Sequence, residues 1–159
     1  MIVLGIDPGL AETGWSVLES QKTLTLIDYG CLKTKKETDF SERLVELADQ
    51  VSLLVEKYKP DVLAIEELFF AKNVKTAIKV AECLGVIKYT VKKSGFPVYE
   101  YTPLNIKMTI AGYGRADKEQ VELMVSRILK LKTKVKPDHA ADAVAVALTH
   151  LYTNLKLKS

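Results

Sequence analysis

Hydrophobic residues at the start of the chain occur in short runs that are typical of β-strands. The segment 2–7 is an apolar run that ends at Pro8 and Gly9, and the segments 13–18 and 23–32 have strand-type composition between polar turns. The pattern therefore predicts three successive strands at the N-terminal end of the chain.

Beyond residue 39 the apolar spacing changes to that of helices. Between Phe40 and Tyr58 apolar residues recur at helical intervals, and Asp39 and Glu42 are spaced like a capping box. A continuous apolar run at 61–66 predicts a strand covered on both faces. The remaining predictions are a helix at 73–93, a strand at 97–101, and helices near 103–111, 117–130 and 138–153. This order predicts an α/β protein.

Length and composition favour one compact domain. The chain has 159 residues, 48% of them hydrophobic, which provides a core and excludes a disordered or fibrous protein. No apolar run is long enough to span a bilayer, and the N-terminus lacks the features of a signal peptide. Cys31 and Cys83 match no metal or redox spacing, so we expect two buried free thiols. These features predict a cytoplasmic protein that does not associate with membranes.

Charge is distributed unevenly along the chain. The net charge is +3, but residues 1–71 carry 7 basic and 13 acidic side chains, whereas residues 72–159 carry 16 and 7. Lysine greatly outnumbers arginine, a balance suited to sequence-independent contact with phosphates. A solubilising lysine surface explains the composition equally well.

Two carboxylates end predicted buried strands. Asp7 closes the first apolar run, and strand alternation places Glu66 on the same side as Val62 and Ala64. Taken alone, Asp7 before Pro8 is also consistent with an ordinary turn. Two carboxylates at the ends of neighbouring buried strands repel each other, and a divalent cation relieves that repulsion.

The predicted helix at 138–153 adds two further candidates. His139 and Asp142 lie three residues apart and share a helix face, and Asp142 interrupts an apolar segment. Asp138 is interpreted as the N-cap and His150 as a surface residue. Together with Asp7 and Glu66, this oxygen-rich set suits Mg²⁺ or Mn²⁺, with two ions positioning a water and a phosphodiester. In such a site His139 is either a ligand or the group that activates water.

Three motifs resemble the RuvC family of bacterial Holliday junction resolvases. They are GIDPG at 5–9 followed by Thr13 and Gly14, AIEELFFAKN at 64–73, and DHAADAVAVALTH at 138–150. The resemblance implies one ribonuclease H-like nuclease domain over residues 1–159, with a five-stranded mixed sheet and helices on both faces. It also implies a Mg²⁺-dependent homodimer that nicks opposing strands of a four-way DNA junction symmetrically and works with RuvA and RuvB.

The family's site residues carry over position by position. Its catalytic acids fall on Asp7, Glu66 and Asp142, and its remaining catalytic position, which is aspartate or histidine among members, falls on His139. By the resemblance, Phe69, Lys107 and Lys118 are expected to contact DNA. Lys72 is a further candidate because it recurs with Lys75 and Lys79 at helical spacing, although a solvated helix face explains this spacing equally well. Arg115 is also expected to contact DNA. By the same resemblance, the dimer contact lies on or near the face of the 73–93 helix that carries Ile78, Ala81, Leu84 and Gly85.

Three other functions are weighed against this one. A related ribonuclease H-like nuclease has the same metal chemistry but another structured DNA or RNA as substrate. An actin-like nucleotide-binding module shares a first strand and turn of this kind, but the chain is short and lacks a second phosphate loop. A catalytically inactive junction-binding protein has no use for a complete acidic set.

Overall fold

The computed structural model describes residues 1–68 and 74–156. Its elements follow the predicted order, and no predicted strand or helix is missing. They are β1 (Ile2–Asp7), β2 (Glu12–Ser20), β3 (Leu24–Lys33), α1 (Phe40–Tyr58), β4 (Val62–Glu66), α2 (Val74–Lys93), β5 (Val98–Tyr101), α3 (Pro103–Ala111), α4 (Lys118–Ile128) and α5 (Asp138–Lys156).

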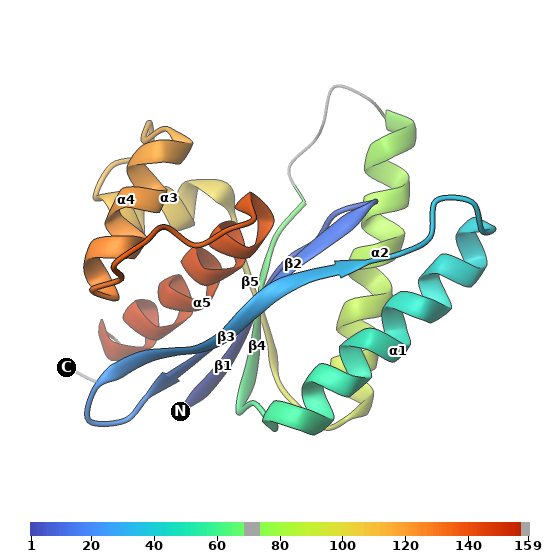
Figure 1. Ribbon diagram of the computed structural model, residues 1–159, viewed down its shortest axis with the longest axis horizontal. Coiled ribbons are helices and arrows are strands. Elements are labelled where there is room, and N and C mark those ends of the chain that lie inside the picture. The colour runs from blue at the N-terminus through green and yellow to red at the C-terminus, as the bar shows by residue number, and fades with distance from the viewer. Residues whose placement is uncertain (69–73, 157–159) are drawn as a thin grey trace.

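The strands form one mixed five-stranded sheet with the order β3-β2-β1-β4-β5. The first three strands form an antiparallel meander, and β4 and β5 are parallel to β1. Helices cover both faces of the sheet, with α1 and α2 on one side and α3, α4 and α5 on the other (Figure 1). The predicted mixed sheet with helices on both faces is therefore confirmed.

Side-chain alternation in the central strands divides the core into two layers. In β1, Val3 packs toward α5, whereas Leu4 and Ile6 pack toward α1 and α2. In β4, Ala64 faces α5 and Ile65 faces the other layer. Both strands are buried on both faces, which explains why each is almost continuously apolar.

Local capping signals determine where several helices begin. Asp39 accepts a hydrogen bond from the Ser41 backbone N–H at the start of α1. Capping boxes open α3, where Thr102 pairs with Asn105, and α4. The helix predicted over 117–130 is shorter, because Asp117 is its cap and the helix ends at Ile128.

The structure corrects two interpretations and modifies a third. His150 is buried, with only 2% of its surface exposed, because its Nδ1 lies 2.7 Å from the Tyr101 hydroxyl oxygen and the Tyr99 ring packs against it. Asp138 is the first residue of α5 and not the residue before it. Both cysteines are free thiols, but only Cys83 is fully buried. Among the described residues, no helix is long and apolar enough to cross a membrane.

Candidate active site

The register between β1 and β4 brings Asp7 and Glu66 side by side. The strands are parallel, and Ile6 lies opposite Ile65. Asp7 and Glu66 are the next residue of each strand, so both emerge at the same edge of the sheet. Alternation sends both side chains toward α5, since Ile6 and Ile65 point to the opposite layer.

The start of α5 lies unusually close to the sheet at this edge. Gly14 of β2 pairs with Asp7 of β1. A Cβ atom at Gly14 would lie only 1.9 Å from the carbonyl oxygen of His139. The missing side chain therefore allows the first turn of α5 to approach the sheet, and this approach brings His139 to Asp7.

Three side chains form a compact group of potential metal ligands. Asp7, His139 and Asp142 each offer one ligand atom, and these atoms all lie within 4.8 Å of one another. His139 Nδ1 lies 2.7 Å from Asp7 Oδ2. The Asp7 side chain is 13% exposed and that of His139 is 47% exposed, so the group opens to solvent on its histidine side.

Glu66 lies beside this group in an adjoining cavity. The cavity has a volume of about 200 Å³, and Glu66, Asp142, Lys107 and Lys118 line it together with apolar residues of α3, α4 and α5. The site therefore combines several carboxylates with two lysines that line the adjoining cavity.

Burial and the repulsion of nearby charges raise the pKa of both strand-end carboxylates, Asp7 and Glu66. Burial, followed by the nearby Asp7 and Asp142 carboxylates, raises the pKa of Glu66 to about 8. Burial also raises the pKa of Asp7, against the opposing hydrogen bond from His139. A negative charge on one carboxylate disfavours ionisation of its neighbour. A divalent cation bound to the carboxylate oxygens favours the ionised forms instead. The donor set therefore fits a hard divalent cation such as Mg²⁺ or Mn²⁺.

Lys118 supplies a positive charge at the rim. Its Nζ lies 3.0 Å from Asp142 Oδ2 and 3.6 Å from Asp138 Oδ2. Partial burial opposes protonation, but the hydrogen bond to Asp142 and the surrounding acidic charges outweigh it and raise the pKa of Lys118. The ammonium group thus lies beside the carboxylates and lines the same cavity as Glu66.

The predicted DNA contacts divide into three groups. Lys107 and Lys118 both line the cavity next to Glu66. Arg115 is exposed in the turn between α3 and α4. Phe69 and Lys72 lie outside the described residues.

One residue that contacts the site region carries no sequence signal. Arg43 of α1 donates a hydrogen bond to the carbonyl oxygen of Leu10, in the turn that follows Asp7. This contact joins residues 33 positions apart and ends on a backbone oxygen, so no residue pattern marks it.

The fold and the site define a class of protein. A mixed sheet in this strand order, with carboxylates converging from β1, β4 and α5, defines a ribonuclease H-like enzyme that depends on a divalent metal ion. Such sites hydrolyse phosphodiesters.

Comparison with known proteins assigns the family. The family described as "Crossover junction endodeoxyribonuclease RuvC" matches residues 3–150. The RuvC of Petrotoga mobilis is 47% identical over 151 residues, which cover 94% of this chain and 93% of that protein. The RuvC of Roseiflexus sp. is 49% identical over 150 residues, covering 94% of this chain and 89% of that protein. The chain therefore belongs to the RuvC family of crossover junction endodeoxyribonucleases.

Solved structures agree with this assignment. Thermus thermophilus RuvC in complex with a Holliday junction substrate superimposes with a TM-score of 0.92 at 36% identity, covering 97% of this chain and 94% of that one. The yeast mitochondrial Holliday junction resolvase has a TM-score of 0.72 at 17% identity, covering 98% and 80%, and supports the fold alone. The chain is a Holliday junction endonuclease.

Proposed function

We propose that this chain resolves four-way DNA junctions by two symmetric nicks in opposing strands, using Mg²⁺ or, in its place, Mn²⁺. The observation that carries the proposal is the group formed by Asp7, His139 and Asp142, whose ligand atoms all lie within 4.8 Å of one another next to Glu66. Together with Glu66, these donors would be enough to hold two divalent ions in each site.

Each side chain of the site has a distinct part in this mechanism. When bound, the divalent ions hold the attacking water in line with the scissile phosphate and stabilise the leaving oxygen. Asp7, Glu66 and Asp142 hold these ions through carboxylate oxygens. Lys118 and Lys107, on the cavity wall, attract the phosphate and reduce the repulsion between it and the carboxylates.

We assign His139 as a metal ligand through a ring nitrogen. The assignment is supported by its place among atoms that are all within ligand-sharing distance, and by the aspartate that the family accepts at this position. His139→Asp is expected to keep most of the cleavage rate, whereas His139→Phe loses it. If both variants are equally inactive, and the pH profile of the wild type shows an imidazole acting as a base, the ligand role is wrong.

The proposed assembly is a homodimer that acts on the junction with RuvA and RuvB. The exposed face of α2 that carries Ile78, Ala81 and Gly85 supports the dimer, because a contiguous exposed apolar patch is typical of a protein interaction surface. Leu84 belongs to the core and not to this face. The cytoplasmic location stays a prediction.

Cleavage of a labelled four-way junction tests the function. The protein is incubated with Mg²⁺ and the junction, and in parallel with a linear duplex and an RNA–DNA hybrid of the same sequence, and cuts are mapped on all four strands. Paired symmetric nicks on the junction alone, which ligase reseals, are expected. Cutting of the hybrid or duplex instead would identify a related nuclease with another substrate.

A further inference from the structure

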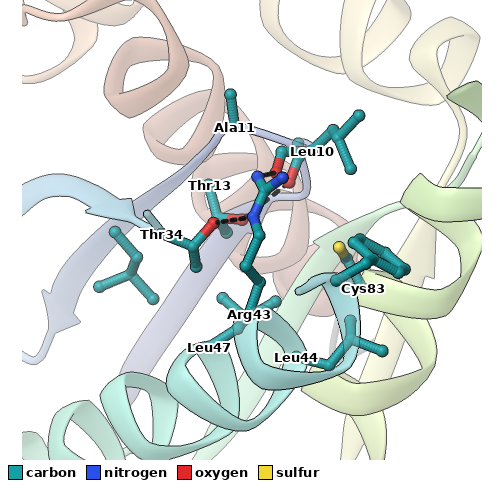
Figure 2. A pocket seen from close by; sticks show the side chains of 11 residues that line it. Leu10, Ala11, Thr13, Thr34, Arg43, Leu44, Leu47 and Cys83 are labelled. Atoms are coloured by element: carbon teal, nitrogen blue, oxygen red, sulfur yellow. Dashed lines mark hydrogen bonds between the residues drawn. The ribbon is translucent and has the colours of Figure 1, made fainter. Parts of the chain in front are cut away.

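One arginine of α1 forms a hydrogen bond to the turn between β1 and β2. Arg43 lies in the first turns of α1, and its side chain reaches under the turn formed by residues 8–11 (Figure 2). Its Nη2 donates to the carbonyl oxygen of Leu10 at 2.6 Å, and its Nε donates to Thr34 Oγ1 at 2.9 Å. A single guanidinium group therefore joins this turn, the segment after β3 and α1.

The surroundings of Arg43 leave little room for the turn to move. The guanidinium lies at a small cavity of about 10 Å³, closed below by apolar side chains of α1 and by Cys83 of α2. Inside the turn, Thr13 Oγ1 donates to the carbonyl oxygen of Gly9. A planar guanidinium that makes two hydrogen bonds restricts both the position and the orientation of the groups it binds. The flexible ammonium group of a lysine does not impose this restriction.

The turn connects directly to the proposed metal ligand Asp7. Leu10, which Arg43 holds, is three residues beyond Asp7, and Gly14 on the other side of the turn pairs with Asp7 in the sheet. The backbone at Asp7 is therefore paired with β2 in the sheet, and the turn that follows it is bonded to Arg43 at Leu10.

We propose that Arg43 is a positioning residue, which holds the β1–β2 turn and thereby sets the Asp7 carboxylate for binding the divalent ion. The inference rests on the role of Asp7 in the proposed function. Residues that orient metal ligands from outside the ligand set typically change metal affinity by about 10–100-fold when they are replaced.

Metal binding without DNA provides the test. Mn²⁺ affinity is measured by electron paramagnetic resonance for the wild type, Arg43→Ala, Arg43→Lys and Thr34→Val. Arg127→Ala is the matched control, because Arg127 is an exposed arginine on α4. The Mg²⁺ concentration for half-maximal junction cleavage is measured for the same proteins.

The expected result is a graded loss of metal affinity. Arg43→Ala weakens Mn²⁺ binding about 10-fold or more and raises the Mg²⁺ requirement by a similar factor. Arg43→Lys and Thr34→Val each retain a contact to the turn, so they reduce Mn²⁺ affinity less. Arg127→Ala does not change Mn²⁺ affinity. Free guanidinium at non-denaturing concentration restores Mn²⁺ binding to Arg43→Ala, a recovery that general destabilisation does not give.

Two results would overturn the inference. One is unchanged Mn²⁺ affinity in folded Arg43→Ala. The other is a loss of Mn²⁺ affinity in Arg43→Ala that free guanidinium does not reverse, together with unchanged affinity in Thr34→Val. If Arg43→Ala does not fold, Thr34→Val decides alone, since it removes one contact of the guanidinium. A wild type that binds Mn²⁺ but does not cut the junction contradicts the proposed function and leaves the Mn²⁺ comparison valid.

Discussion

At the scale of single residues, Asp7 has the most constrained position in the site. It contacts His139, ends the central strand and is part of the ligand group. Asp7→Asn is expected to reduce junction cleavage at least about 1,000-fold, because a neutral amide oxygen binds a divalent cation more weakly than an ionised carboxylate does. Junction binding stays intact, since removing a negative charge near phosphate does not weaken electrostatic attraction.

Strand-resolved cleavage and gel-shift titration measure these two effects separately. Glu56→Gln is the matched control, because it removes one negative charge from an exposed position on α1. Loss of junction binding by folded Asp7→Asn would contradict the assignment of Asp7 to metal chemistry.

Glu66 makes the stability of the metal-free protein depend on pH. Its folded-state pKa of about 8 lies above the ordinary value of 4.5, so between these values the folded state holds a proton that the unfolded state has lost. The free energy of unfolding therefore falls as pH rises from about 4.5 to 8. Glu66→Gln is expected to melt about 2–4 °C above the wild type at pH 8, which corresponds to a gain of roughly 1 kcal/mol in the free energy of unfolding.

Thermal unfolding in a chelator at pH 5 and pH 8 measures this difference. Added Mg²⁺ stabilises the wild type more at pH 8 than at pH 5, because the ionised carboxylates bind it, and Glu66→Gln loses most of this response. Equal pH dependence of the wild type and the variant would show that Glu66 ionises normally.

At the scale of elements, the site depends on how closely α5 approaches the sheet. A methyl group at Gly14 overlaps the His139 carbonyl, so Gly14→Ala displaces the start of α5 and with it His139 and Asp142. A shift of about 1 Å costs about 100-fold in rate, and overpacking costs about 1–3 kcal/mol of stability. We expect both losses, together with weaker Mn²⁺ binding.

Arg127→Ala is the control for stability and Mn²⁺ affinity, because it shortens an exposed side chain on α4 and adds no group between α5 and the sheet. Gly14→Ala with unchanged Mn²⁺ affinity would show that α5 tolerates the methyl group without moving.

The elements and the positions of the two strand-end carboxylates were predictable from local patterns, because apolar periodicity and strand alternation act over a few residues. The same alternation that places Glu66 beside Ala64 determines its direction in the structure. His150 and Arg43 were not predictable, since their partners Tyr101 and Leu10 lie 49 and 33 residues away in the chain. Contacts of this kind arise only when the sheet assembles.

At the scale of the whole molecule, the site and the exposed apolar residues of α1 and α2 lie on opposite sides of the sheet. Asp7 and Glu66 lie on the sheet face that α5 covers, whereas α1 and α2 cover the opposite face of the sheet (Figure 1). On these two helices Val45, Ile78 and Tyr89 are 61%, 56% and 64% exposed. A groove of about 570 Å³ runs between the helices, with Val45 and Tyr89 among its lining residues. A second copy placed on this surface by a twofold axis leaves both active sites free for two equivalent DNA strands.

Ile78→Asp is therefore expected to convert the dimer to a monomer, because a buried, unpaired charge at an apolar contact is strongly unfavourable. Light scattering would then give the 17.7 kDa mass of one chain in place of twice that value. On a plasmid that extrudes a cruciform, the proposed dimer is expected to make both nicks in one binding event and to yield linear DNA, whereas a monomer is expected to yield nicked circles first. Leu123→Asp places the same charge at an exposed apolar position on α4 and keeps the linear product. A monomeric Ile78→Asp that still produces linear DNA directly would show that paired cutting does not need the dimer.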